Sequence, residues 1–242
     1  MNREKLFIGI DNGKHGATAV IDIDRNILKT FKYEEGNTLK LYEELKEYSE
    51  NYKLYAFIEK PIVVYGLAHQ TAPFETIGRH KMTLEILKIP YRIGDPAATS
   101  PTNWKRIIGL FETAKDASRE NSKEISALNK QARQIVAQAE LLGLSEDHLK
   151  ADKIAYMQPE IAKLANDYRN LKKKVAKLRG EKKASVKQTS VDACLRIFPE
   201  SNAYIEKFGK SGKALKNKYD DDIAEAILLA ECGRTLYING NF

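Results

Sequence analysis

Apolar residues occur in short runs over the first hundred positions of the chain, and five of these runs are typical of β-strands. They span Lys5–Ile10, Ala17–Ile23, Ile27–Tyr33, Leu54–Glu59 and Ile89–Ile93. The short turn between the second and third runs predicts a hairpin. The pattern therefore predicts a sheet that begins with three strands in direct succession.

Between and after these runs, apolar residues recur every three or four positions, which is the spacing of a helix that packs one face on a core. This spacing predicts helices over residues 38–50, 75–87, 103–110 and 190–198, followed by an acidic C-terminal helix. The segment 61–74 and the lysine-rich segment after the fourth helix are predicted loops. A meander of strands that then alternates with helices indicates an α/β fold, with a mixed five-stranded sheet and helices on both faces.

The strand pattern stops at about residue 113 and does not resume. Two series of apolar residues follow, and both step strictly by three and four, which is the seam of a coiled coil. Gly143 ends the first series, and Pro159 suits the first turn of the second helix. We predict an antiparallel helical (coiled-coil) hairpin over 113–184, inserted into a discontinuous α/β domain of residues 1–112 and 185–242. The two series are Ile125, Leu128, Ala132, Ile135, Ala139, Leu142 and Ile161, Leu164, Tyr168, Leu171, Val175, Leu178.

Positive charge concentrates in the predicted hairpin. The chain of 242 residues has 40 Lys+Arg and 33 Asp+Glu, a net charge of +7. Residues 113–184 carry 16 basic against 10 acidic side chains, a net +6, so the remainder carries 24 against 23. Such a basic segment is either a solvated helix face or a phosphate contact, and we predict phosphate contact. The candidate DNA-binding residues of this segment are Lys172, Lys173, Lys174, Lys177 and Arg179.

The sequence gives no sign of a membrane or secreted protein, of a disulfide or of a zinc site. No apolar run approaches the roughly 20 residues of a membrane span, and no secretion signal precedes the first strand, so we expect a cytoplasmic protein without a membrane partner. Cys194 and Cys232 lie in apolar helical patterns and are expected to be reduced packing residues. None of the four histidines falls in a zinc-binding spacing, so a zinc site is not expected.

Acidic residues stand where the predicted buried elements end. Asp11 ends the first strand, Glu59 ends the fourth, and Asp221, Asp222 and Glu225 fall on the first turns of the C-terminal helix. Carboxylates gathered in one pocket repel one another unless divalent cations neutralise them. Phosphodiester cleavage uses a pair of ions bound in this way, so the pattern predicts a metal-dependent nuclease.

Each of these acids also has an ordinary structural explanation. Asp11 precedes a turn at Asn12–Gly13, and Asp or Glu at a helix start is a common N-terminal capping residue. Glu59 is harder to explain, because a Glu between Ile58 and Lys60 at a strand end has no turn role. No single acid therefore establishes a site. The evidence is that all of them occur together and in a set order along the chain: an Asp at a strand end, a Glu at a second strand end, and Asp and Glu at the start of a helix.

That order and its flanking residues resemble the RuvC-like Holliday junction resolvases, a branch of the RNase H-like nucleases. The resemblance covers roughly residues 5–112 and 186–235, and the segment between them departs from it. Each motif is modest alone, and five in the right order make a strong resemblance. The motifs are IGIDNGKHGATAVID, AFIEKP, SPTNWKRIIGL (similar to the Pro-x-x-Trp-Lys helix of phage and organellar members), KQTSVDACLRIFP and DDDIAEAILLAE.

The resemblance implies a metal site and a mechanism. Asp11, Glu59, Asp222 and Glu225 would be metal ligands, with Asp221 as the alternative third ligand. Two Mg²⁺ ions, for which Mn²⁺ is expected to substitute, would activate the attacking water and stabilise the leaving 3′-oxygen. Glu225 stands where bacterial members mostly have Asp, although phage-type sequences tolerate Glu.

Further residues near these motifs are candidates for contact with DNA. Lys105 is a candidate for an electrostatic role at the scissile phosphate, with an ordinary surface lysine as the equal alternative. Trp104 beside it is expected in the core. Tyr65 and Phe74, on the predicted loop after Glu59, could stack or wedge at the junction centre, or could simply pack.

The expected partners are branched DNA and a second copy of the chain, because a four-way junction has two-fold symmetry and needs two active sites. A role in DNA recombination and repair follows, in the bacterial host cytoplasm if the protein is phage-encoded. Three alternatives stay open. They are a less selective branched or flap DNA nuclease on the same fold, a non-catalytic DNA-bridging scaffold, and an ATP-binding protein of the actin and sugar-kinase superfamily. No second phosphate loop supports the last, so no nucleotide cofactor is expected.

Overall fold

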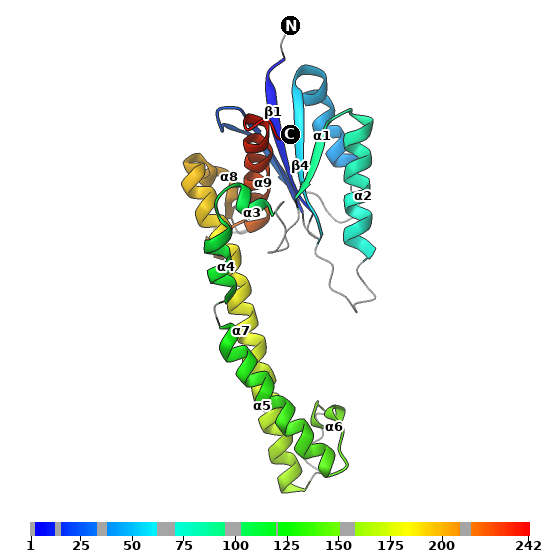
Figure 1. Ribbon diagram of the computed structural model, residues 1–242, viewed down its shortest axis with the longest axis vertical. Coiled ribbons are helices and arrows are strands. Elements are labelled where there is room, and N and C mark those ends of the chain that lie inside the picture. Colours follow the sequence, from blue (N-terminus) through cyan, green and yellow to red (C-terminus); the bar gives the residue numbers. More distant parts are fainter. Residues whose placement is uncertain are drawn as a thin grey trace. The chain divides into compact units, whose positions relative to one another are not determined.

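One mixed sheet of five strands, in the order β3-β2-β1-β4-β5, organises the larger part of the computed structural model (Figure 1). The strands are β1 (Lys5–Asp11), β2 (Ala17–Asp22), β3 (Ile27–Lys32), β4 (Lys53–Glu59) and β5 (Tyr91–Gly94). β1 pairs antiparallel with β2 and parallel with β4. All five strands predicted from the sequence are present, and their bounds differ from the predicted ones by at most two residues.

The structure describes residues 3–12, 16–32, 38–61, 71–94, 103–119, 121–150, 158–208 and 214–242. Contacts divide the chain into two compact units, which are 1–114 with 187–242 and 115–186. The insertion predicted from the sequence is 113–184, two residues earlier at each end than the second unit. Among the described residues, no helix is long and apolar enough to cross a membrane.

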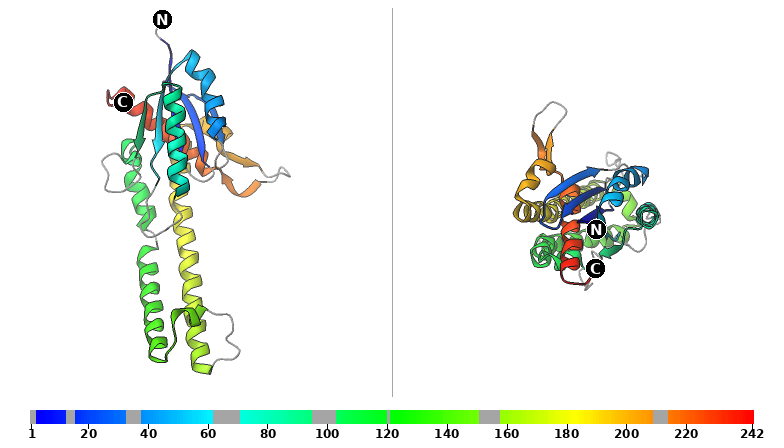
Figure 2. Two further views of the ribbon diagram at one scale, coloured as in Figure 1. Left: turned by 90° about the vertical axis from the view of Figure 1, so that its right-hand side faces the viewer. Right: turned by 90° about the horizontal axis from the view of Figure 1, so that it is seen from above.

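Helices cover both faces of the sheet, because the strands are apolar on both sides. The even-numbered residues of β1 and β4, such as Leu6 and Ile58, pack with α1 (Thr38–Asn51) and α2 (Thr71–Ile86). The odd-numbered residues, such as Phe7, pack with α9 (Asp221–Ile238) (Figures 1 and 2). Val191 and Cys194, near the end of α7 (Pro159–Ile197), join this second layer. The sequence therefore places a side chain on the α9 face when its position in β1 or β4 is odd.

Two predicted loops contain regular structure. α2 begins at Thr71, so residues 71–74 belong to the helix and not to the preceding loop. The lysine-rich segment after Phe198 contains a 3-10 turn, α8 (Asn202–Ile205) and a two-stranded antiparallel ribbon. In the sequence ALKNKY, Lys216 and Lys218 alternate with other residues, and this period of two is typical of a strand. The ribbon consists of β6 (Glu206–Phe208) and β7 (Ala214–Tyr219).

The described residues of the unit 115–186 form helices and turns and no strand, as the absence of strand patterns predicts. It comprises α5 (Ser122–Leu141), α6 (Glu146–Lys150) and the N-terminal part of α7, with α4 (Phe111–Arg119) leading into it. α5 and α7 pack antiparallel, because Leu128 contacts the group of Val175 and Leu178, whereas Ala139 contacts the group of Ala165 and Tyr168. Regular coiled-coil packing of this pair stays a prediction.

The predicted seam extends one residue too far. Leu142 follows the last residue of α5 and its side chain is 53% exposed. Gly143 adopts a φ of +74°, a left-handed conformation that glycine accepts and that ends the helix. Pro159 is the first residue of α7, as predicted.

Deleting residues 115–182 and joining the ends by a short Gly/Ser linker is expected to leave the larger unit folded. The hydrophobic clusters of the described residues support this, because each cluster draws its members from one unit only. Far-ultraviolet circular dichroism and a cooperative thermal transition of the shortened chain provide the measurement. An insoluble or non-cooperatively melting product would show that residues 115–182 are required for the larger unit to fold.

Candidate metal centre

Two carboxylates lie side by side because β1 and β4 are parallel neighbours. Ile10 is paired with Ile58, so the residues that follow them, Asp11 and Glu59, meet at the same edge of the sheet. Both positions are odd, so both side chains belong to the face that α9 covers. The apolar strands themselves are buried, which is why the acids come only where each strand ends.

A glycine in β1 allows α9 to approach this edge. A Cβ built on Gly9 would lie 1.9 Å from the Ala226 carbonyl oxygen and 2.3 Å from the Ala230 backbone nitrogen. Any larger residue at this position would push α9 away from the strand. Glu225 directly precedes Ala226, so this close approach brings a third carboxylate to Asp11.

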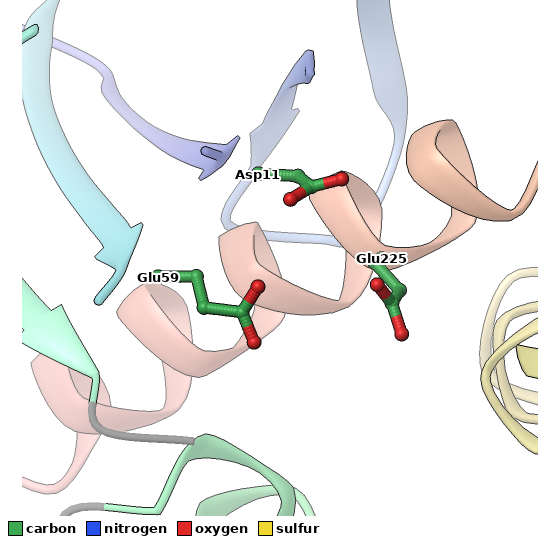
Figure 3. A group of neighbouring side chains, drawn as sticks. All are labelled: Asp11, Glu59 and Glu225. Carbon is green, nitrogen blue, oxygen red and sulfur yellow. The ribbon is translucent and has the colours of Figure 1, made fainter. Parts of the chain in front are cut away.

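Asp11, Glu59 and Glu225 form the acidic triad. Each offers a carboxylate oxygen, and the three atoms all lie within 4.8 Å of one another (Figure 3). Oxygen ligands on opposite sides of one Mg²⁺ lie about 4.2 Å apart, and about 4.8 Å apart for Ca²⁺. The oxygens of the acidic triad therefore lie at a spacing that a single hard divalent cation can bridge with small side-chain movements.

Burial and mutual repulsion dominate the electrostatics of the triad. Removal from water, and next the negative charge of Glu225, raise the pKa of Glu59 from 4.5 to about 7. The indole nitrogen of Trp104 opposes this shift by donating a hydrogen bond of 2.7 Å to Glu59 Oε1, and the charge of Lys105 opposes it as well. In the metal-free protein, two adjacent ionised carboxylates are thus unfavourable, and a bound cation would remove that penalty.

Three side chains support the triad. Ser190 Oγ, on α7, donates a hydrogen bond of 2.9 Å to Glu225 Oε1. Lys105 Nζ lies 3.8 Å from the same oxygen and 4.9 Å from the centroid of the Trp104 ring. Trp104 is fully buried, as the sequence predicts, and it also holds Glu59. Lys105 and Trp104 therefore both belong to the site, on α3 (Trp104–Ile107).

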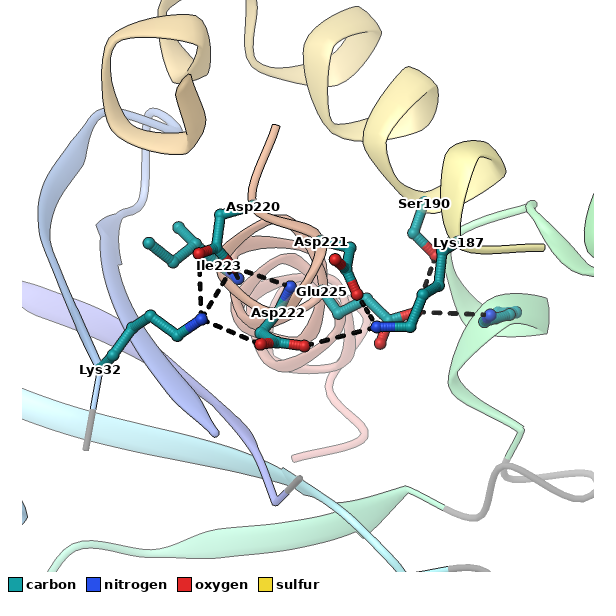
Figure 4. A network of polar contacts seen from close by, with 9 residues as sticks. Lys32, Lys187, Ser190, Asp220, Asp221, Asp222, Ile223 and Glu225 are labelled. Carbon is teal, nitrogen blue, oxygen red and sulfur yellow. Dashed lines mark hydrogen bonds and ion pairs between the residues drawn. The ribbon is translucent and has the colours of Figure 1, made fainter. Parts of the chain in front are cut away.

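The acids that begin α9 have a different environment. Asp220 caps the helix by accepting hydrogen bonds from the backbone nitrogens of Asp222 and Ile223. Lys32 Nζ lies 2.9 Å from Asp222 Oδ2, and Lys187 Nζ lies 3.6 Å from Asp222 Oδ1 (Figure 4). Asp222 therefore lies between two ammonium groups and is not part of the acidic triad.

Asp221, the alternative third ligand, is paired with Lys187 and is likewise outside the triad. Lys32 also contacts Asp220, at 2.9 Å from Oδ2. The structure thus groups three of the four predicted ligands and leaves the role of Asp222 and Asp221 in metal binding as a prediction.

The remaining predicted residues are distributed over both units. Tyr65 lies outside the described residues. Phe74 lies on the first turn of α2 and not on a loop, and 43% of it is exposed. In the helical unit, Lys174 pairs with Glu124 at 2.8 Å. The other candidates are Lys172, 3.9 Å from Glu146, Lys177, 3.8 Å from Glu181, and the exposed Lys173 and Arg179.

Some residues of the site were not found from the sequence. Ser190, Lys187 and Lys32 were not predicted, and the bond between Trp104 and Glu59 was not expected. The three-residue spacing of Lys187 and Ser190 on one helix face was an available signal. No local signal in the sequence points to Lys32, because its partners lie about 190 positions away. No protein-family model matches the sequence, and no curated protein matches it either.

Proposed function

We propose that this protein is a Mg²⁺-dependent, structure-specific endodeoxyribonuclease that resolves four-way (Holliday) DNA junctions by symmetric nicking. The observation that carries the proposal is the acidic triad, in which a strand Asp, a strand Glu and a helix Glu converge. The mixed five-stranded sheet with helices on both faces agrees with the RNase H-like architecture that the sequence motifs imply.

Each residue of the site has a role in this proposal. Asp11, Glu59 and Glu225 bind the metal, while Trp104 and Ser190 hold two of these carboxylates in place. Bound Mg²⁺ would supply an activated water and stabilise the leaving 3′-oxygen. Lys105, partly buried beside Glu225, would place a positive charge near the scissile phosphate.

The helical unit would supply contacts to the DNA backbone. Its candidate residues are exposed cations on one helix, and several of them also form ion pairs with acids of the same unit. Exposed pairs of this kind contribute little stability, so phosphate oxygens can replace the carboxylates. Backbone contacts set affinity and carry no sequence information, so the sequence preference of cleavage does not follow from them.

Cleavage of labelled DNA tests the proposal. A synthetic four-way junction, a three-way junction, a 5′-flap and a linear duplex are incubated with the protein in Mg²⁺, in Mn²⁺ and in EDTA. We expect paired nicks at symmetric positions of the four-way junction, with at least about tenfold slower cutting of the other substrates. A cruciform plasmid adds a second readout, because paired incision yields linear DNA and single incision yields nicked circles.

Each other outcome identifies an alternative. Equal cutting of flaps and junctions would identify a less selective branched-DNA nuclease with the same chemistry. Binding of junctions without cleavage in either metal would identify a non-catalytic DNA-bridging protein and contradict the proposal. A matched control is Asp24→Asn, which changes an exposed acid in the turn between β2 and β3 and is expected to cut at the wild-type rate.

A further inference from the structure

The ribbon of β6 and β7 stands apart from the main sheet. Neither strand pairs with any of the five strands of that sheet. Figure 2 shows the ribbon, in orange, projecting from the side of the larger unit. An isolated two-stranded hairpin is at best marginally stable in water, so the ribbon depends on how its base is anchored.

The base of the ribbon is fixed to the core of the larger unit. The backbone nitrogen of Asp220 donates a hydrogen bond of 2.7 Å to the carbonyl oxygen of Ile205, which joins the two residues that flank the ribbon. Ile205 is fully buried, and Tyr219 packs against the same cluster. Tyr204 donates a hydrogen bond of 2.9 Å to the carbonyl oxygen of Ile27. Beyond this base, the two strands contact each other more than any other described element.

The charge of the ribbon has a single sign. Residues 207–219 contain five lysines and no aspartate or glutamate. The unit 1–114 with 187–242 has 24 basic and 23 acidic residues, so without these five lysines it has 19 against 23, a net charge of −4. The ribbon thus supplies positive charge to a unit that is otherwise acidic. The lysines are Lys207, Lys216 and Lys218 on the two strands, and Lys210 and Lys213, which lie outside the described residues.

Protection of the strand edges explains only part of this composition. Lysines on exposed edges prevent pairing with other chains, which suits the lysines on β6 and β7. It does not explain the two lysines between the strands, or the absence of any acid in the same segment. Like charges on one projecting element repel one another, and an anionic partner would remove that repulsion.

The ribbon begins close to the acidic triad along the chain. β7 ends at Tyr219, Asp220 caps α9, and Glu225 lies five residues further. Five residues of helix span about 7.5 Å, and the six residues of β7 extend at most about 20 Å. The backbone of β7 therefore lies within about 28 Å of that of Glu225, which is less than the roughly 34 Å of one turn of B-DNA.

We propose that the lysine ribbon (β6, β7 and the residues between them) binds the phosphate backbone of a duplex DNA arm, within about one helical turn of the phosphate at the acidic triad. A two-stranded ribbon is narrow enough to lie in the major groove. Its positive charge would offset the repulsion between DNA and the acidic remainder of this unit. The inference rests on the proposed function and adds one surface that positions the substrate without reading its sequence.

The salt dependence of DNA binding tests this surface. Binding of a labelled four-way junction is measured by fluorescence anisotropy in EDTA, over a range of salt concentrations, for wild type and for a ribbon variant. Each lost phosphate contact lowers the slope of log affinity against log salt by about 0.9, so we expect a slope smaller by about 2 to 3. The same contacts imply a loss of affinity of about a hundredfold at 0.1 M salt. The ribbon variant combines Lys207→Gln, Lys216→Gln and Lys218→Gln.

The matched control removes the same charge from other exposed positions of the same unit. It combines Lys46→Gln, Lys53→Gln and Lys88→Gln, and its slope is expected to stay within about 0.5 of the wild-type slope. Thermal melting of both variants is measured alongside. If the ribbon variant does not fold, a single substitution that keeps every lysine decides the question.

That substitution is Asn217→Cys, which carries an iron–EDTA probe on β7. Cys194 and Cys232 are fully buried, so the probe attaches at position 217. Without added Mg²⁺, radical cuts are expected on a duplex arm within about ten base pairs of the site of the Mg²⁺-dependent nick. The same probe on Lys46→Cys, at an exposed position of α1, is expected to give no cuts there.

A folded ribbon variant that keeps the wild-type slope overturns the inference, and so does an equal loss in the control variant. Cuts by the position-217 probe that are absent, or that lie more than two turns from the nick, overturn it as well. Either result leaves the proposed function standing if the protein still cleaves junctions. Conversely, a protein that binds DNA through the lysine ribbon and does not cleave it in Mg²⁺ contradicts the proposed function alone.

Discussion

Asp11→Asn and Glu225→Gln are each expected to lower metal-dependent cleavage at least about a thousandfold. Both changes keep the size of the side chain and remove one negative charge from the acidic triad. Mg²⁺ is bound through a small number of carboxylates, so one lost charge weakens both the binding and the placement of the ion. Removal of a single group that stabilises transition-state charge typically costs a hundredfold to a thousandfold in rate, and loss of metal adds to that.

Single-turnover cleavage over a titration of MgCl₂ measures this effect. Cleavage at saturating Mg²⁺ distinguishes two defects. A variant that binds the ion more weakly recovers its rate at high Mg²⁺, whereas a variant that misplaces the ion does not. Asp24→Asn is the exposed control. Retention of more than a tenth of the wild-type rate by Asp11→Asn would contradict the assignment of the acidic triad as the catalytic centre.

The same titration decides the role of the acids that begin α9. If Asp222 is a metal ligand, the cleavage rate of Asp222→Asn is expected to fall as far as those of the triad variants. If Asp222 only forms ion pairs with Lys32 and Lys187, the variant is expected to keep most of the wild-type rate. Asp221→Asn is the parallel test of the alternative ligand, which pairs with Lys187.

The sequence identified the ends of the strands well, for a physical reason. The middle of a buried strand excludes charge, so Asp11 and Glu59 mark the ends of the two apolar runs. Positions 11 and 59 are both odd, so the alternation of side chains along paired strands places both acids on the face that α9 covers, once β1 and β4 are known to be neighbours. That pairing joins segments about 50 residues apart, and no local pattern specifies it.

The cluster of acids from Asp220 to Asp222 illustrates what sequence alone could not resolve. Capping and metal binding favour the same residue types at a helix start. Asp220 takes the capping role because its side chain reaches the backbone nitrogens of the first turn. Asp222 and Asp221 pair instead with Lys32 and Lys187, which come from elements distant in the sequence, so the local sequence does not show that both acids lie outside the triad.

The errors in the predicted elements have local causes. The sequence predicts a loop at Phe74, because the preceding Gly, Pro and aromatic residues hide the start of α2. It predicts a loop at the lysine-rich ribbon, because the charges there obscure the strand alternation. In both segments the composition is typical of a loop, whereas the periodicity indicates the helix or strand.

Glu59→Gln is expected to stabilise the metal-free protein while removing its response to Mg²⁺. Burial and the charge of Glu225 raise the pKa of Glu59 to about 7 in the folded state, against about 4.5 in the unfolded chain. Between these values the folded state binds more protons than the unfolded state, so the free energy of unfolding falls as pH rises. The cost is absent below about pH 4.5, grows up to about pH 7 and is fully present above it, where it reaches roughly 3 kcal/mol.

Glutamine at position 59 stays neutral and can still accept the hydrogen bond from Trp104. Urea unfolding in EDTA is therefore expected to show a more stable variant at pH 8, by up to about 3 kcal/mol, and no difference at pH 4.5. Added Mg²⁺ is expected to stabilise the wild type at pH 8, because it binds the folded state, and to affect the variant much less. Glu43→Gln, at an exposed position of α1, is the control for loss of one charge. A variant less stable than wild type at pH 8, or equally stabilised at both pH values, would show that the repulsion within the triad is not what Glu59 contributes. The expected result would mean that repulsion within the triad destabilises the metal-free protein and that a bound cation restores this stability.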